Sequence, residues 1–126
     1  GATEEEAWRK AKGILAGVEA AGAGGKSRVP EAETARRLMS LIDGGEVQDE
    51  RLWVPIAAAA QGSGNSTALV GTAEQVAEAI ATYYDMGVSG VLIRGFDPFN
   101  DAIEYGNELI PQIREKVAAR DAALSA

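Results

Sequence analysis

The sequence contains no cysteine and no histidine. Without cysteine the chain has no disulfide scaffold, no thiolate metal ligand and no thiol nucleophile. The missing histidine removes the commonest general base near neutral pH and the commonest metal ligand. The carboxylates do not cluster at a ligand spacing either, so we expect no metal site. If the chain belongs to an enzyme, groups outside it are expected to supply the acid–base chemistry.

Positive charge and long apolar runs are also scarce. The 126 residues carry 12 basic and 19 acidic side chains, for a formal net charge of -7. Nucleic acids and anionic membrane surfaces both favour clustered Lys and Arg, so neither is an expected partner. No window holds the roughly 18 consecutive apolar residues that a membrane span requires. The start is acidic at Glu4, Glu5 and Glu6, where a signal peptide would be basic.

The first half of the chain predicts two helices. Thr3 is a good N-cap, and Glu6 completes a capping-box pattern for a helix that runs to about Ala21. Residues 30–42 begin with a proline suited to a first turn and continue with apolar residues at helical spacing. The small, polar run 61–66 that follows is predicted to be a mobile loop.

The second half predicts the order strand, helix, strand, helix. Residues 68–70 form a short apolar run, and Thr72 with Gln75 makes a second capping box. Residues 88–93 predict a buried strand, and residues 97–98, Asp followed by Pro, start the last helix. This order indicates a βαβ unit and therefore a parallel sheet. Because two strands do not make a stable parallel sheet alone, we expect neighbouring strands from outside the sequence or from another chain.

The block from residue 67 to residue 111 resembles a known family. It contains TALVGTAEQVA (67–77), MGV (86–88), LIRGFDP (92–98), DAIEYG (101–106) and ELIP (108–111). These stretches resemble the luciferase-like monooxygenases, with the alkanesulfonate monooxygenase branch as the nearest match. The opening TEEEAW (3–8) resembles the start of the helix after that family's sixth barrel strand. Members of the family are (β/α)8 barrels that use reduced FMN and oxygen.

The resemblance implies an α/β fold in which residues 1–126 are the C-terminal part of a single (β/α)8 TIM barrel. Residues 1–66 would hold the sixth barrel helix and an insertion with a mobile loop. Residues 67–126 would hold the last two strands and their helices. The first six strands, most of the flavin phosphate contacts, and a histidine and an arginine after strand six would lie outside the sequence. We therefore expect the segment alone to bind no flavin and to be inactive.

The end of the expected final strand is the first candidate site, because barrel enzymes place their chemistry at the C-terminal ends of the strands. The substrate or flavin pocket candidates are Arg94, Gly95 and Phe96. Arg94 could offer a forked donor to a sulfonate or a flavin oxygen. Alternatively, it pairs with Asp97 or Asp101 and ties the strand to its helix. The family often has a tyrosine where Phe96 falls, so any hydrogen bond from that hydroxyl is absent here.

The loop before the expected seventh strand is the second candidate. In alkanesulfonate monooxygenases a mobile loop at this place carries an arginine and closes over the substrate. By that resemblance the lid candidates are Gln61, Gly62, Ser63, Gly64 and Asn65. A lid of that kind excludes water from the reaction. The loop holds no arginine, which argues against assuming an alkanesulfonate substrate, and its plainer interpretation is a surface linker.

The resemblance implies that the full-length protein is an FMNH2-dependent monooxygenase, an oxidoreductase that acts with O2 on a small organic substrate. An alkanesulfonate, giving an aldehyde and sulfite, is the first expectation. The implied partners are a flavin reductase that supplies FMNH2 and further copies of the chain in a homo-oligomer. The lack of cysteine fits a cytoplasmic location. The alternatives are a non-catalytic truncated fragment and a small α/β interaction module that self-associates.

Overall fold

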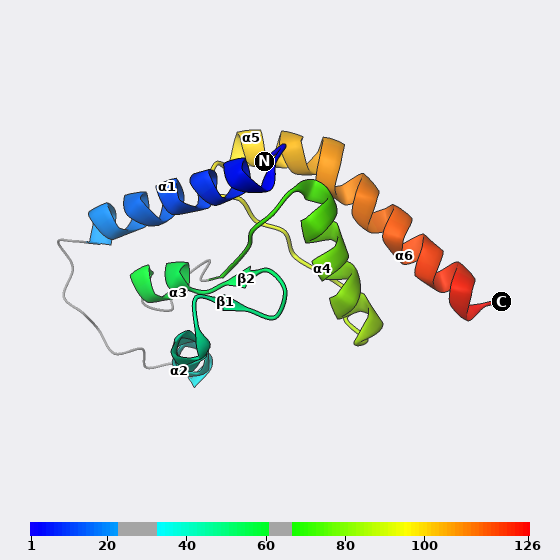
Figure 1. The fold of residues 1–126 in the computed structure, drawn as a ribbon, viewed down its shortest axis with the longest axis horizontal. Coiled ribbons are helices and arrows are strands. Elements are labelled where there is room, and N and C mark those ends of the chain that lie inside the picture. The colour runs from blue at the N-terminus through cyan, green and yellow to red at the C-terminus, as the bar shows by residue number, and fades with distance from the viewer. Residues whose placement is uncertain (23–32, 61–66) are drawn as a thin grey trace.

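The computed structural model describes residues 1–22, 33–60 and 67–126. The helices of the first half are α1 (Glu4–Gly22), α2 (Glu33–Ser40), the 3-10 turn η1 (Leu41–Gly44) and α3 (Pro55–Ala59). The strands are β1 (Val47–Gln48), β2 (Leu52–Trp53) and β3 (Ala68–Leu69). The helices of the second half are α4 (Ala73–Asp85), α5 (Pro98–Glu104), the π-helical turn η2 (Tyr105–Leu109) and α6 (Ile110–Leu124). Figure 1 shows α1 and α6 leading away from each other on either side of α5, with β1 and β2 below α1.

Helix α1 confirms the predicted first helix and its cap. The Glu6 N–H donates to the Thr3 hydroxyl at 3.2 Å, while the Glu6 carboxylate accepts from the Ala2 N–H at 3.1 Å. The buried face of α1 is narrow and consists of Ala7 and Ala11. These alanines allow α1 to lie close to a buried cluster on the sheet and α3, which includes Trp53, Ile56 and Val70. Burial of this apolar surface is the main force that holds α1 in place.

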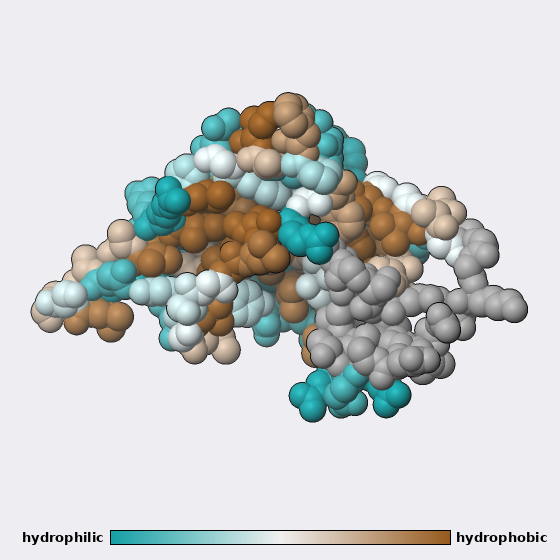
Figure 2. Space-filling model, turned by 180° about the vertical axis from the view of Figure 1, so that it is seen from behind, coloured by the Kyte–Doolittle hydropathy of each residue, from teal (hydrophilic) through white to brown (hydrophobic). Residues whose placement is uncertain are grey.

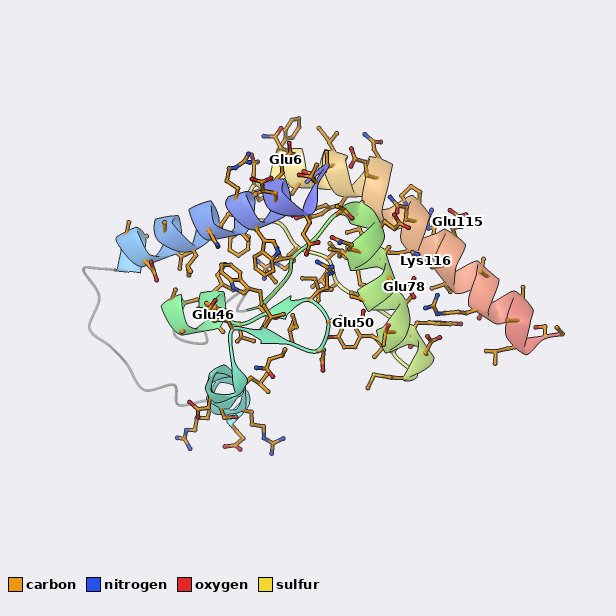
Figure 3. The ribbon with its side chains drawn as sticks, in the orientation of Figure 1. Glu6, Glu46, Glu50, Glu78, Glu115 and Lys116 are labelled. Atoms are coloured by element: carbon orange, nitrogen blue, oxygen red, sulfur yellow. The ribbon has the colours of Figure 1, made fainter. Side chains whose placement is uncertain are left out.

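Helix α4 confirms the second predicted capping box. The Gln75 N–H donates to the Thr72 hydroxyl at 3.3 Å, and the Thr72 N–H donates to the Gln75 side-chain oxygen at 2.9 Å. Gly87 follows the helix with a φ of 97°, a conformation that favours glycine. Charged side chains then join α4 to α6, and Figure 3 shows Glu78 and Lys116 pointing toward one another across this interface.

The predicted parallel pairing of residues 68–70 with residues 88–93 is wrong in this structure. β2 is the central strand, and it pairs antiparallel with both β1 and β3. Residues 88–93 form no strand, although their backbone is described throughout. The physical reason is that β3 finds its hydrogen-bond partner in β2, and apolar character alone does not specify a partner. The helix and strand content nevertheless agrees with an α/β chain.

The remaining helical predictions hold in part. Within the predicted helix over 30–42, the described residues form α2 and then tighten into η1. The last helix begins as predicted, because the Asp97 side chain accepts from the Asn100 N–H and Pro98 follows in the first turn. It continues through η2 into α6, where Pro111 lies in the first turn. The π-helical turn lies just before Pro111, at the point where the helix must do without the N–H that proline lacks.

Candidate functional site

A cleft of about 530 Å³ lies between elements from both ends of the chain. Its apolar wall includes side chains from α1, β2, α3, α4 and residues 88–97, which we call the extended segment. Examples are Ile14, Trp53, Ile56, Val70, Ile80 and Leu92. Its polar lining includes Lys10, Thr72, Arg94, Glu104, Tyr105 and Glu108. Figure 2 shows that the back of the molecule carries a broad apolar area. A mostly apolar hollow with a few polar groups is the usual form of a small-molecule site.

The extended segment leading into α5 exposes unusually large apolar side chains. Leu92 is 86% exposed and Val91 is 51% exposed, although both stand in the most apolar run of the second half. Phe96, Phe99 and Ile103 are exposed as well. Several large apolar side chains exposed within one short stretch favour a place where another element or molecule packs.

Arg94 and Phe96, two of the three pocket candidates, line the cleft. In the described part of the chain, Arg94 forms no ion pair with Asp97 or Asp101, so the alternative role as a tie between strand and helix is not observed. The Arg94 guanidinium is exposed on the cleft wall, where an anion could reach it. Whether Arg94 binds substrate or flavin stays a prediction.

Gly95, the third candidate, has a steric role. A Cβ atom at this position would overlap with the Cβ and carboxylate of Asp101. The backbone of the turn therefore approaches Asp101 as closely as only glycine permits. Sequence reasoning placed Gly95 in the pocket without identifying this contact.

Asp101 is the buried charged side chain of the described chain, with 2% of its surface exposed. One carboxylate oxygen accepts from Lys10 Nζ at 2.7 Å, and the other accepts from the Asp97 N–H at 2.9 Å. Lys10 also contacts the Glu104 carboxylate at 3.2 Å. Burial raises the pKa of Asp101, but hydrogen bonds from Lys10 and from the backbone of Asp97 and Phe96 outweigh it, so the pKa lies below its ordinary value.

Lys10 is held by the same interactions. Burial lowers the pKa of Lys10, but its bonds to Asp101 and Glu104 have the larger combined effect. The pKa of Lys10 is therefore raised to about 12. Sequence reasoning considered Asp101 only as a partner for Arg94 and missed Lys10. No local signal could have found this pair, because the two residues lie 91 positions apart.

The remaining sequence predictions concern the lid candidates, Thr72, metal binding and membrane spans. The lid candidates Gln61, Gly62, Ser63, Gly64 and Asn65 lie outside the described residues. The Thr72 hydroxyl, at the start of α4, is used by the capping box. Among the described residues, no group of three acidic, histidine or cysteine side chains could hold a metal ion. In that same part of the chain, no helix combines the length and apolarity needed to cross a membrane.

These features define an α/β chain with a mostly apolar cleft that carries a few polar side chains. A half-buried ion pair between Lys10 and Asp101 joins distant parts of the sequence beside this cleft. The chain belongs to the luciferase-like monooxygenase family, because the family description "Luciferase-like monooxygenase" matches residues 1–90. This match confirms the resemblance that the sequence motifs predicted.

Curated relatives are similar to the chain over part of its length. One of them is the sulfoquinovose monooxygenase of Agrobacterium fabrum (strain C58 / ATCC 33970), 31% identical over 78 residues. The aligned region covers 62% of this chain but only 20% of that relative, so the chain spans about a fifth of the relative's length. No solved structure matches the chain.

Proposed function

We propose that this chain is part of a monooxygenase that uses reduced FMN and O2 to oxidise a small organosulfonate. In that reaction one oxygen atom of O2 enters the substrate carbon, the other leaves as water, and FMNH2 supplies two electrons. The carbon–sulfur bond then breaks to give an aldehyde and sulfite. The family match over residues 1–90 carries the proposal, and the similarity to a sulfoquinovose monooxygenase supports a sulfonate over other substrates.

Within such an enzyme, residues 1–66 would form the sixth barrel helix with an insertion, and residues 67–126 the last two βα units. The exposed side chains of Val91 and Leu92 support this arrangement. A barrel strand is covered on both faces and paired on both edges, so in a complete barrel these side chains would not face solvent. Residues 88–93 would then gain the strand partners that the described chain does not offer.

The cleft fits one end of a flavin better than the other. Its apolar wall suits a flat ring, and Arg94 supplies a cation for a ring oxygen or a sulfonate. The phosphate end fits poorly, because both backbone and hydroxyl of Thr72 at the start of α4 are bonded to Gln75. The phosphate contacts are therefore assigned to parts of the protein outside this chain. When bound, reduced FMN supplies the oxygen activation, while these residues hold the substrate and exclude water.

We further propose, on the family resemblance alone, a lid, a reductase partner and an oligomeric state. Residues Gln61, Gly62, Ser63, Gly64 and Asn65 would close over the substrate as a lid. A separate flavin reductase would supply FMNH2, and the enzyme would form a homo-oligomer in the cytoplasm.

The test is oxidation of sulfonates by the complete protein that contains this chain. Enzymatically reduced FMN, O2 and a panel of sulfoquinovose and simple alkanesulfonates are supplied, and sulfite is measured against oxygen consumed. We expect sulfite from at least one sulfonate. Arg94→Ala should raise the KM for that sulfonate about 10- to 100-fold, the range for losing a hydrogen bond to a charged group. Arg114→Ala, on an exposed position of α6, is the matched control and should change nothing.

Reduced flavin that is consumed by oxygen without product from any sulfonate would overturn the proposed substrate class. Unchanged KM in Arg94→Ala would remove Arg94 from the site while leaving the reaction intact.

The second candidate function is a small, self-associating α/β module, which the exposed Leu92 and Phe99 favour. Sedimentation of the 126-residue chain, combined with FMN titration, separates the two. A defined oligomer that binds no flavin, together with a complete protein that oxidises no sulfonate, would favour the module.

A further inference from the structure

We propose that Asp101 is a positioning residue, which together with Lys10 holds the turn that keeps Arg94 at the edge of the cleft. The role of Arg94 toward an anionic substrate rests on the proposed function. We call the Lys10–Asp101 ion pair, together with the bond from the Asp97 N–H to Asp101, the clamp. The clamp itself rests only on the geometry of the described residues. It joins α1, near the start of the chain, to the turn before α5, and Figure 1 shows the first turns of α1 beside α5.

The two oxygens of the Asp101 carboxylate have different tasks. Oδ2 accepts the Asp97 N–H at 2.9 Å, which fixes the backbone just after the pocket candidates. Oδ1 accepts the Lys10 ammonium at 2.7 Å, which fixes the carboxylate against α1. An ionised carboxylate with 2% exposure is stable only when it is paired and hydrogen-bonded, so each partner restrains the other.

These bonds are not needed to start helix α5. Asp97 already caps the helix, since its side chain accepts from the Asn100 N–H at 3.3 Å and from the Asn100 side chain at 2.6 Å. The bonds of Asp101 run backward instead, from within the helix into the turn. Pro98 has no N–H, so the turn has few donors with which to be anchored.

The sequence of the turn is adapted to this contact. Gly95 leaves the space that the Asp101 side chain occupies, and any Cβ there would displace it. Arg94 and Phe96 on either side of Gly95 both line the cleft. Restraining the backbone at this point therefore restrains both cleft residues.

The test combines amide hydrogen exchange with kinetics on the complete protein. Asp101→Asn keeps the side-chain shape but removes the charge, and Lys10→Met removes the partner. Exchange of the Asp97 amide, which donates to Asp101, should become about tenfold faster in both variants, beyond any change in the core helices. Lys10→Arg should restore slow exchange, because it keeps the cation. Lys12→Met, an exposed lysine on the same helix, should behave as the wild type.

Kinetics decide whether the clamp positions Arg94. Asp101→Asn should raise the KM for the sulfonate with a smaller change in kcat. In the Asp101→Asn background, Arg94→Ala should raise KM about tenfold less than it does in the wild type. The reason is that the Arg94 guanidinium is then no longer held at the edge of the cleft. Multiplicative effects of the two substitutions would overturn the positioning role and leave a purely structural ion pair.

The exchange measurement separates this inference from the proposed function. Unchanged exchange of the Asp97 amide in Asp101→Asn and Lys10→Met would overturn the clamp whatever the activity. If the wild type oxidises no sulfonate, the proposed function fails, and exchange alone then decides the clamp. If Asp101→Asn does not fold, the contrast between Lys10→Met and Lys10→Arg carries the test.

Discussion

The Lys10 ammonium and the Asp101 carboxylate lie 2.7 Å apart, although 91 residues separate them in the sequence. The contact joins α1 to α5, two helices that both border the cleft. A pair with such a long sequence separation forms only once the chain has folded. Its titration therefore reports on the folded state and not on local helix formation.

The first prediction concerns acid stability. The pKa of Asp101 is lowered in the folded protein, so its contribution to stability is complete above its ordinary pKa of about 4. That contribution is lost as the pH falls through the lower folded-state pKa. The free energy of unfolding of the wild type should therefore fall more steeply below about pH 4 than that of Asp101→Asn. Urea titrations at a series of pH values measure this, and parallel curves would contradict it.

The second prediction concerns alkaline stability. The pKa of Lys10 is raised to about 12, above its ordinary value of 10.5. Its contribution is complete below the ordinary value and is lost as the pH rises through about 12. Lys10→Met should lack this alkaline loss in urea titrations, whereas Lys12→Met should retain it. Equal slopes for the two variants would show that Lys10 does not titrate differently on folding.

The third prediction concerns the close approach at Gly95. Gly95→Ala introduces a Cβ that overlaps with the Asp101 side chain, and one of the two must move. Overpacking of this kind costs about 1–3 kcal/mol in the free energy of unfolding. Gly90→Ala is the control, since a Cβ at Gly90 meets nothing within 4 Å. Chemical denaturation of both variants gives the comparison, and equal losses would refute the steric explanation.

Local sequence signals predicted the helix starts well. The caps at Thr72 and Asp97 each accept an N–H only three residues further on, where side chain and backbone are necessarily close. The family motifs likewise predicted the family, which the match over residues 1–90 confirms.

Contacts between distant segments could not be predicted in the same way. The run 88–93 is apolar enough for a buried strand, but strand formation also needs a partner, and none lies beside it in the described chain. β3 was predicted as a strand, yet its antiparallel pairing with β2 depends on residues 15 and 17 positions earlier. The Lys10–Asp101 clamp left no local pattern at all. The candidate turn at 94–96 was therefore found, while the residues that hold it were not.

The fourth prediction concerns the core beneath α1. Trp53 is 3% exposed, and its ring meets Trp8 edge to face with centroids 5.9 Å apart. Trp53→Ala should lower the free energy of unfolding by about 3–5 kcal/mol, because it leaves a large cavity. Trp53→Phe keeps an aromatic ring and should cost less. Denaturation followed by circular dichroism measures both, and similar losses would show that the cavity does not dominate.

The last prediction concerns the interface between α4 and α6. Arg120 bridges two acidic side chains of α4, with Nε 2.9 Å from Asp85 and Nη2 2.7 Å from Glu78. Arg120→Ala should lower the Tm by a few degrees, whereas Arg114→Ala, at an exposed position of the same helix, should leave it unchanged. Because the bridge is partly exposed to solvent, the difference between Arg120→Ala and the wild type should shrink at about 1 M salt. A difference that persists at high salt would mean that the arginine stem stabilises the interface by packing and not by charge.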